Sequence, residues 1–356
     1  MSLSPPPDRY QKSGKAALSG GYGQVEIWHD TSLARDVAIK WTAPENAKQL
    51  LNEVRALSQR PSPYIVEIYD IVLDQVGNLS AVILEYLTGQ GFEVVDLKPD
   101  EARHQALKLL YQMAQGLADL HAVDLVHRDV KPANAVCTSD GRLKLVDFGL
   151  SSPGTGAVTV EAKGTMGYAA PEFFGPKPIP ITAAMDVYSF GMVCWKKLTG
   201  KLPKVGEFGI PDSTSYPLPS IETKVSLPAT LVKIIDQCLA WPSEDRPEMQ
   251  AVADALMAEL TFGKHTACVL LAGKPPYAVT TAAGKVSSLK TPNGELDIGY
   301  DGYKFTIKRV QGNVYVNNAI AKVGQHLHLG CLLTFGGPGS SRQFIPFRQS
   351  SPEIVF

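Results

Sequence analysis

The sequence lacks the long apolar segments that mark a membrane helix. No stretch of its 356 residues reaches the roughly 18 uninterrupted apolar residues of a membrane span. The N-terminal segment Met1 to Asp8 lacks the basic and then apolar pattern of a signal peptide and instead contains Pro5, Pro6 and Pro7. We therefore expect a cytoplasmic protein without membrane association, and a flexible leader over residues 1–14.

Closely spaced cysteines are also missing. The chain contains no Cys-x-x-Cys pair and no Cys/His cluster that could supply tetrahedral zinc ligands. We expect reduced, mostly buried thiols, as in other intracellular chains. The five cysteines are Cys137, Cys194, Cys238, Cys268 and Cys331.

Net charge is nearly absent, at −1, but it is unevenly distributed. Residues 264–356 contain ten Lys and Arg against four Asp and Glu, a net charge of +6, which leaves −7 for residues 1–263. Two independently solvated surfaces account for this asymmetry; the alternative is that the basic segment attracts the rest of the chain or an acidic protein partner. The segment has no lysine run and no interleaved aromatic residues, so we expect no nucleic-acid partner.

The chain is longer than the roughly 250 to 300 residues at which single cores stop growing, so two domains are expected. The first part of the chain, residues 15–87, predicts a β-rich lobe with a single helix over 46–59. Its strands, rich in Val and Ile, are predicted over 24–28, 36–41, 65–73 and 79–87.

The next part, residues 88–262, predicts a mostly helical lobe. A Gly- and Pro-rich stretch over 204–228 is expected to be an irregular loop. Helices are predicted from about residue 99 and around 186–198, 229–239 and 248–260.

After residue 263 the sequence changes to short runs of Val, Ile, Tyr and Phe broken by Gly, Asn and Pro. This spacing predicts a small all-β sandwich or barrel over 266–356, with the boundary near 262–266. Its expected strands are 266–271, 304–310, 313–317 and 332–335. The fold class is therefore α+β, with two lobes followed by a small all-β domain.

A glycine-rich turn precedes the first predicted strand, in Ser19-Gly20-Gly21-Tyr22-Gly23-Gln24-Val25. Glycines let backbone N–H groups approach phosphate oxygens, although a plain hairpin turn would look similar. Lys40 follows Val25 by fifteen residues, where it can reach the α and β phosphates of a nucleotide. Glu53, beside the apolar stripe of the predicted helix, is the expected ion-pair partner of Lys40.

The strongest signal is His127-Arg128-Asp129-Val130-Lys131-Pro132-Ala133-Asn134, followed by Asp147-Phe148-Gly149. Transfer of a phosphoryl group from ATP requires held phosphates, metal ions and a hydroxyl presented in line. Asp129 can accept the proton of the substrate hydroxyl and Lys131 can contact the transferring phosphoryl group. Asn134 and Asp147 supply the hard oxygen ligands that Mg²⁺ prefers, with Mn²⁺ as an alternative.

Residues 15–262 resemble a eukaryotic-type (Hanks-type) serine/threonine protein kinase domain, with an N-lobe over 15–87 and a C-lobe over 88–262. Gly164 to Glu172 resembles the substrate-docking segment of the family, and Asp186 to Gly191 resembles its central buried helix. The resemblance implies a buried ion pair between Arg246 and Glu172. Lys131 and Thr165 resemble the serine/threonine subgroup rather than the tyrosine subgroup.

The resemblance also assigns an adenine pocket. It implies Val25, Ala38 and Val136 around the base, Leu84 as gatekeeper, and Glu85 to Leu87 as the hinge. The predicted nucleotide-binding residues are therefore Leu18, Gly20, Gly21, Gly23, Val25, Ala38, Lys40, Leu84, Glu85, Leu87 and Val136.

Two features depart from the family pattern. Leu18 replaces the first glycine of the phosphate loop, and the interval from Lys40 to Glu53 is short. The residues expected to contact metal, phosphate and proton are all present. This favours an enzyme that phosphorylates Ser/Thr hydroxyls of proteins over the alternative, a pseudokinase-like nucleotide-binding scaffold.

Arg128, directly before Asp129, resembles kinases whose activation segment is ordered by a phosphate, because a guanidinium binds phosphate bidentately. The segment offers Ser151, Ser152, Thr155 and Thr159 as acceptors, of which Thr159 is our predicted site of self-phosphorylation.

Residues 312–336 are similar to the C-terminal half of a forkhead-associated β-sandwich. The arginine and the serine or histidine that bind phosphothreonine in that family are not found between Ala272 and Phe305. The sequence therefore favours a sandwich without phosphopeptide binding over a working phosphopeptide reader. His326 and His328 alternate on a predicted strand and are expected to be solvated or packed.

Overall fold

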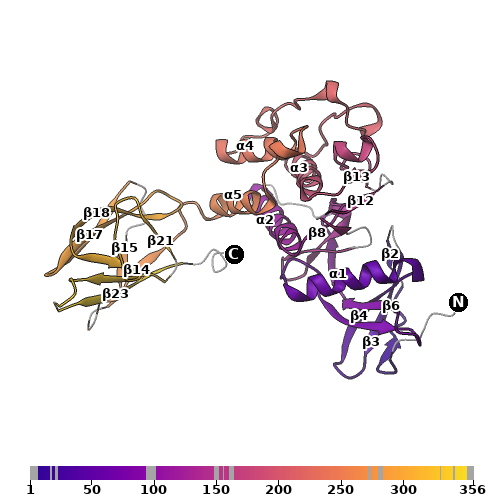
Figure 1. Ribbon diagram of the computed structural model, residues 1–356, viewed down its shortest axis with the longest axis horizontal. Coiled ribbons are helices and arrows are strands. Elements are labelled where there is room, and N and C mark those ends of the chain that lie inside the picture. The colour runs from indigo at the N-terminus through magenta and orange to yellow at the C-terminus, as the bar shows by residue number, and fades with distance from the viewer. Residues whose placement is uncertain are drawn as a thin grey trace. The chain divides into compact units, whose positions relative to one another are not determined.

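The computed structural model describes residues 7–16, 18–20, 23–93, 102–147, 152–154, 156–159, 164–271, 273, 275–279, 284–328, 330–339 and 341–350 (Figure 1). Contacts divide the chain into two units, Met1–Leu256 and Met257–Phe356. The first unit has a β-rich N-terminal lobe and a helical C-terminal lobe, and the second unit is all β after the end of its first helix. The predicted fold class is therefore confirmed.

The N-terminal lobe is a six-stranded antiparallel sheet with one helix. Its strands follow the order β1-β3-β4-β6-β5, and β2 pairs with β3. Helix α1 (Ala47–Gln59) buries Val54 and Leu57 and packs against β6, and Figure 1 shows it lying across the strands. The strands are β1 (Tyr10–Lys12), β2 (Leu18–Gly20), β3 (Gly23–Asp30), β4 (Arg35–Trp41), β5 (Ile68–Leu73) and β6 (Leu79–Glu85).

Alternation of side chains gives this sheet two buried faces. On one face Val37, Ile39 and Ile83 pack beneath Tyr10 of β1, a strand that the sequence did not suggest. On the other face Val82 packs against α1. The second face also carries Lys40, because Lys40 is the cross-strand partner of Val82.

The C-terminal lobe is organised around helix α3 (Ala183–Thr199). All residues from Met185 to Trp195 are buried, as expected for a helix that is apolar on every side. Gly200 ends the helix with φ +79°, a left-handed conformation that glycine adopts without steric cost. The other helices of this lobe are α2 (Ala102–His121), α4 (Ala229–Cys238) and α5 (Met249–Thr261).

The C-terminal lobe also contains short strands and 3-10 turns. Strands β7 (Gly89–Gly91), β9 (Ala135–Thr138) and β10 (Leu143–Leu145) form a three-stranded sheet in the order β10-β9-β7. The predicted irregular loop over 204–228 contains only 3-10 turns. The remaining strands are β8 (Leu125–Val126), β11 (Ser152–Pro153), β12 (Val158–Thr159) and β13 (Ile179–Pro180). The 3-10 turns of this lobe are η2 (Pro132–Asn134), η3 (Pro171–Phe174), η4 (Glu207–Gly209), η5 (Ser213–Ser215), η6 (Ile221–Thr223) and η7 (Ser243–Asp245), whereas η1 (Pro44–Asn46) precedes α1 in the N-terminal lobe.

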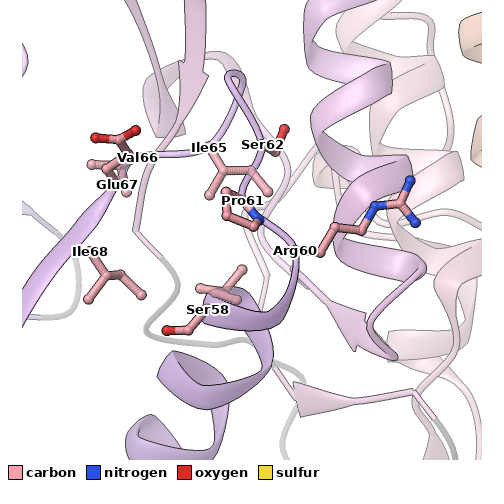
Figure 2. A pocket seen from close by; sticks show the side chains of 9 residues that line it. Ser58, Arg60, Pro61, Ser62, Ile65, Val66, Glu67 and Ile68 are labelled. Atoms are coloured by element: carbon pink, nitrogen blue, oxygen red, sulfur yellow. The ribbon is translucent and has the colours of Figure 1, made fainter.

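A cavity of about 170 Å³ lies where α1 leads into β5 (Figure 2). It contains none of the predicted catalytic residues, so we do not assign it a role in catalysis. Beside the cavity, Nη2 of Arg60 lies 3.5 Å from Oδ1 of Asp119 in α2. This ion pair connects the two lobes. The cavity is lined by Leu57, Ser58, Arg60, Pro61, Ser62, Ile65, Val66, Glu67 and Ile68.

The second unit is a sandwich of two antiparallel sheets. The six-stranded sheet has the order β15-β14-β23-β22-β19-β20 and the four-stranded sheet β16-β17-β18-β21. Both sheets contribute to one core, with Phe335 and Phe347 from the first and Tyr300 and Phe305 from the second. The strands are β14 (Ala267–Val269), β15 (Tyr277–Val279), β16 (Val286–Thr291), β17 (Gly294–Tyr300), β18 (Phe305–Gly312), β19 (Val314–Val316), β20 (Ala319–Ile320), β21 (His326–Leu327), β22 (Leu332–Phe335) and β23 (Gln343–Gln349).

The division between the units falls within α5, before the boundary that the sequence predicted at 262–266. That predicted boundary stays a prediction. Among the described residues, no helix combines the length and the apolar character needed to cross a membrane.

Two phenylalanines of β23 test how the sandwich is stabilised. Phe347 is fully buried and stacks edge-on against Phe305, with 5.7 Å between ring centroids, whereas Phe344 is 54% exposed. Phe347→Ala should lower the free energy of unfolding of this unit by about 3 to 5 kcal/mol, because it leaves a cavity. Phe344→Ala should cost less than about 1 kcal/mol. Hydrogen exchange of the β17–β18 amides measures both, and equal losses would contradict this assignment of the core.

Candidate active site

The loop that carries the predicted catalytic base is hydrogen-bonded to one buried carboxylate, that of Asp186. Asp186 of α3 is fully buried, and its Oδ2 and Oδ1 accept hydrogen bonds from the backbone N–H groups of His127 (2.7 Å) and Arg128 (2.8 Å). Nε2 of His121 lies 2.9 Å from Asp186 Oδ2. These contacts satisfy the buried charge and fix the loop at Arg128, whose φ of +69° is unusual for a residue with a side chain.

Asp129 is the centre of a cluster of polar side chains. Its Oδ2 accepts a hydrogen bond from Asn134 Nδ2 (2.9 Å) and lies 2.8 Å from Lys131 Nζ. Its Oδ1 accepts a hydrogen bond from Thr165 Oγ1 (2.7 Å), which in turn accepts one from Lys131 Nζ (2.7 Å). Burial disfavours the charged form of Asp129, but the hydrogen bonds from Lys131 and Thr165 outweigh it and lower the pKa of the carboxyl. Asp129 is therefore ionised at neutral pH and can accept a proton.

The predicted ion pair between Lys40 and Glu53 is wrong for this structure. Lys40 Nζ instead lies 2.6 Å from Oδ1 of Asp147. Glu53 is 3% exposed, and its Oε1 accepts a hydrogen bond from Gln49 Nε2 of the same helix (3.1 Å). Lys40, Glu53 and Asp147 all line one small cavity, so both carboxylates are near the ammonium group and Asp147 is the closer. Spacing along the sequence could not decide between them.

Glu53 occupies an apolar environment formed mainly by α1 and β6. Its Oε2 is buried and has no hydrogen-bond partner among the described residues. Burial raises the pKa of Glu53 to about 8, although the hydrogen bond from Gln49 and the charges of Lys40 and Arg128 act in the opposite direction. The carboxyl is therefore largely protonated at neutral pH in this arrangement.

The two predicted metal ligands lie on adjacent segments, because the backbone N–H of Val146 donates a hydrogen bond to the carbonyl oxygen of Asn134 (3.0 Å). The Asn134 amide nitrogen donates hydrogen bonds to Asp129. The amide oxygen therefore points away from Asp129. Asp147 contributes a carboxylate. Among the described residues no group of three or more His, Cys, Asp or Glu side chains could hold a metal ion by itself. A single carboxylate with an amide oxygen fits Mg²⁺, which retains waters and uses substrate phosphates as ligands.

The sheet brings several of the predicted adenine-pocket residues to the face that carries Lys40. Val25 is the cross-strand partner of Lys40, and Leu84 is the partner of Ala38, so their side chains share this face. Val136 lies in β9 of the opposite lobe, and Leu87 lies between β6 and β7. Their joint role in binding adenine stays a prediction.

The predicted phosphate loop is only partly within the described residues. Strands β2 and β3 pair with Leu18 opposite Val25 and Gly20 opposite Gly23, as expected for a hairpin. Gly21 lies outside the described residues, so its predicted contact with phosphate is untested.

The ion pair implied between Arg246 and Glu172 is present. Arg246 is 7% exposed, and its two Nη atoms donate to Oε1 and Oε2 of Glu172 at 2.7 and 3.0 Å. The guanidinium also donates to the carbonyl oxygens of Ala184, Ala240 and Trp241. The pair connects the docking segment to α3 and to the loop after α4.

One charged residue near the site was not predicted from the sequence. Lys144 of β10 is 8% exposed and donates a hydrogen bond to Glu85 Oε2 at the end of β6. The available signal was a lysine between two leucines in a short buried strand, a position where an unpaired charge would be costly.

Residues 15–256 match the protein kinase domain family. The chain belongs to this family. Proteins of the family transfer a phosphoryl group with ATP and Mg²⁺. The kinase domain therefore includes Asp129 and the residues that surround it in this structure.

The chain is similar to several curated bacterial proteins. It is 32% identical over 206 residues to the serine/threonine-protein kinase PknA of Corynebacterium glutamicum, covering 54% of this chain and 43% of that protein. It is 28% identical over 315 residues to the serine/threonine-protein kinase PknB of Mycobacterium tuberculosis, covering 82% of this chain and 50% of that protein. The serine/threonine-protein kinase pkn2 of Myxococcus xanthus is 28% identical over 298 residues, with 77% and 35% covered. The matches thus span half or less of these relatives.

The environment of Glu53 predicts a pH dependence of stability. A carboxyl with a higher pKa in the folded than in the unfolded chain binds its proton more tightly when folded, so stability falls as pH rises between those two pKa values. Glu53→Gln removes this titration. Its free energy of unfolding relative to the unaltered chain should rise by on the order of a few kcal/mol from about pH 5 to about pH 9, measured by urea unfolding.

The matched control for this experiment is Glu45→Gln, because Glu45 is exposed in the turn before α1. Its relative stability should not change with pH. A flat pH profile for Glu53→Gln as well would contradict the buried, protonated carboxyl.

Proposed function

We propose that this chain is a serine/threonine-protein kinase that transfers the γ-phosphoryl group of ATP to Ser and Thr hydroxyls of proteins, including its own activation segment. The observation that carries the proposal is the cluster of Asp129, Lys131, Asn134 and Thr165 beside the pair of Lys40 and Asp147. We assign the kinase domain to residues 15–262 and the β-sandwich to 266–356. The site of action that we propose is the cytoplasm, where ATP and protein substrates meet.

In this proposal each side chain has a separate task. Asp129 accepts the proton of the attacking hydroxyl, and Lys131 contacts the transferring phosphoryl group. Lys40 orients the α and β phosphates. Asn134 and Asp147 would hold Mg²⁺, which neutralises phosphate charge when it is bound. The hydrogen bond from Lys131 to Thr165 supports the serine/threonine assignment, because it joins the two residues that resemble this subgroup.

The segment that precedes Gly164 is the proposed site of self-phosphorylation. Thr159 of β12 pairs with Ile179 of β13. Of the other acceptors, Ser151 and Thr155 lie outside the described residues, and Ser152 pairs with Val126 in the two-stranded sheet of β11 and β8. We keep Thr159 as the proposed acceptor and Arg128 as the proposed contact for its phosphate.

The proposed activity is tested with the Asp129→Asn variant. Loss of a positioned general base typically lowers the rate about 10² to 10⁴-fold. Transfer of labelled phosphate from Mg·ATP to a protein substrate should fall by this factor, and the intact mass should show phosphate only on the unaltered chain. The exposed Glu45→Gln variant, away from Asp129, should keep full activity. Equal transfer by the Asp129→Asn variant and the unaltered chain would favour the alternative, a nucleotide-binding scaffold.

We also propose that the basic β-sandwich, which resembles a forkhead-associated domain, binds an acidic protein partner. Leu333, Phe335, Ile345 and Phe347 point into its core, so their neighbours along β22 and β23 point outward. The outward face of the six-stranded sheet is largely apolar. It includes Phe344 (54% exposed) and Ile320 (70% exposed), with Tyr315 and Thr334 in the row between them and the paired Leu332 and Pro346 in a neighbouring row.

Arginine side chains lie next to this apolar face. Arg342 lies over the ring of Tyr315, 5.7 Å from its centroid, and Arg348 is exposed at the other end of β23. The net charge of +6 on residues 264–356 adds to the same field. The proposed occupant is therefore a protein segment that combines acidic and apolar side chains.

A pair of synthetic peptides tests this surface. A peptide of alternating glutamate and leucine should bind the chain more tightly than the matching lysine and leucine peptide, because only the first complements the arginines. Phe344→Asp should weaken binding at least tenfold, whereas Phe174→Asp, at an exposed phenylalanine of the kinase domain, should not. Isothermal titration calorimetry gives these affinities. Equal affinity for the two peptides, or no binding of either, would contradict the proposal.

A further inference from the structure

Lys144 and Glu85 form a buried ion pair between the two lobes of the kinase domain. Lys144 belongs to the strand β10, two residues before Val146, and its side chain is 10% exposed. Glu85 is the last residue of β6, and its side chain is 22% exposed. The pair therefore joins the sheet of the N-terminal lobe to the short sheet of the C-terminal lobe. We call these two residues the hinge pair.

Glu85 is fixed by more than this ion pair. Its backbone N–H donates a hydrogen bond to the carbonyl oxygen of Glu67 (2.9 Å), and its Oε2 accepts one from the N–H of Glu67 (3.3 Å). Oε2 thus receives both a backbone donor and the Lys144 ammonium group. The position and the direction of Glu85 are set before any ligand binds.

Lys144 in turn lies beside a residue of the predicted adenine pocket. The register of the short sheet places Lys144 opposite Val136, and Val136 opposite Gly91 of β7. Cross-strand partners project from the same face, so Lys144 and Val136 are neighbours on one face. The hinge pair therefore connects Glu85, at the hinge side of the predicted adenine pocket, to the sheet that contains Val136 on the opposite side of that pocket.

The chain between the two ends of this connection is short and closely packed. Only Tyr86, Leu87 and Thr88 separate β6 from β7. At the start of β7, a Cβ added to Gly89 would lie 2.0 Å from the carbonyl oxygen of Cys137, so the backbone approaches β9 as closely as a glycine allows. Segment 86–88 is thus held at both ends, and the hinge pair adds a second connection from the end of β6 to the short sheet through β10.

We propose that Lys144 is a positioning residue for adenine binding, acting through Glu85 to set the distance between the hinge and Val136. This inference rests on the proposed function, because it needs a nucleotide in the cleft. Loss of either partner leaves a charge in a mostly buried position without its counterion, and the remaining side chain then moves toward solvent. The hinge backbone then moves with Glu85, and the distance between the hinge and Val136, which sets the space for adenine, changes.

The experiment measures binding of adenosine and of Mg·ADP by isothermal titration calorimetry. Adenosine carries the base and the ribose but no phosphate, so it reports on the hinge end of the cleft alone. Lys144→Met and Glu85→Gln should each weaken both ligands about tenfold, and the double variant should weaken them about tenfold rather than a hundredfold, because the two residues act as one unit. Lys40→Met, at the phosphate end, should weaken Mg·ADP and leave adenosine within about twofold.

Two controls separate positioning from loss of structure. Lys144→Arg keeps the charge and should restore most of the affinity. Lys290→Met breaks an exposed ion pair with Glu295 in the β-sandwich and should change neither ligand. Unchanged adenosine binding by Lys144→Met, or multiplying effects in the double variant, would overturn this inference and leave the kinase proposal intact. Failure of the unaltered chain to bind either ligand would overturn the kinase proposal, and this inference with it.

Discussion

The buried carboxylate of Asp186 is the constraint on which the rest of the active site depends. Its two oxygen atoms are fully buried on α3 and accept hydrogen bonds from the backbone N–H groups of His127 and Arg128. Polar atoms buried in this way are costly unless their donors keep their positions, so the backbone of the catalytic loop has little freedom. The backbone position of Asp129 is fixed as well, because Asp129 directly follows Arg128 in the chain.

Specific contacts at Leu145 and Asp147 join the two lobes. The backbone of Leu145 pairs with the segment around Tyr64 and Val66, which leads into the N-terminal sheet. Lys40 reaches across from that sheet to Asp147. Proximity and orientation of reacting groups account for much of the rate in phosphoryl transfer, so these connections are as important as the side chains that contact the substrate.

Much of this arrangement could be predicted from the sequence, because some motifs impose local geometry. The run from His127 to Asn134 fixes its own spacing, and its residues do converge around Asp129. The strand carrying Lys40 and the helix carrying Glu53 were predicted to within one residue at most ends. In the β-sandwich the strands β16, β17 and β23 were missed. The alternation of Leu296, Ile298 and Tyr300 in β17 was an available signal, whereas β16 buries only one apolar side chain and Pro346 interrupts the apolar run of β23.

The distances between side chains of different elements could not be predicted from the sequence. Lys40 lies near both Asp147 and Glu53, and the distance between α1 and β4 decides which carboxylate it pairs with. The hinge pair was missed for the same reason, since Glu85 and Lys144 are 59 residues apart and belong to different sheets.

A crystal structure of the chain with Mg²⁺ and a non-hydrolysable ATP analogue would locate the nucleotide and the metal ion. We expect adenine against the backbone of Glu85 to Leu87, a metal ion bound by Asn134 and Asp147, and the γ-phosphate directed toward Asp129. A nucleotide bound elsewhere, or a metal ion that contacts neither Asn134 nor Asp147, would contradict this prediction.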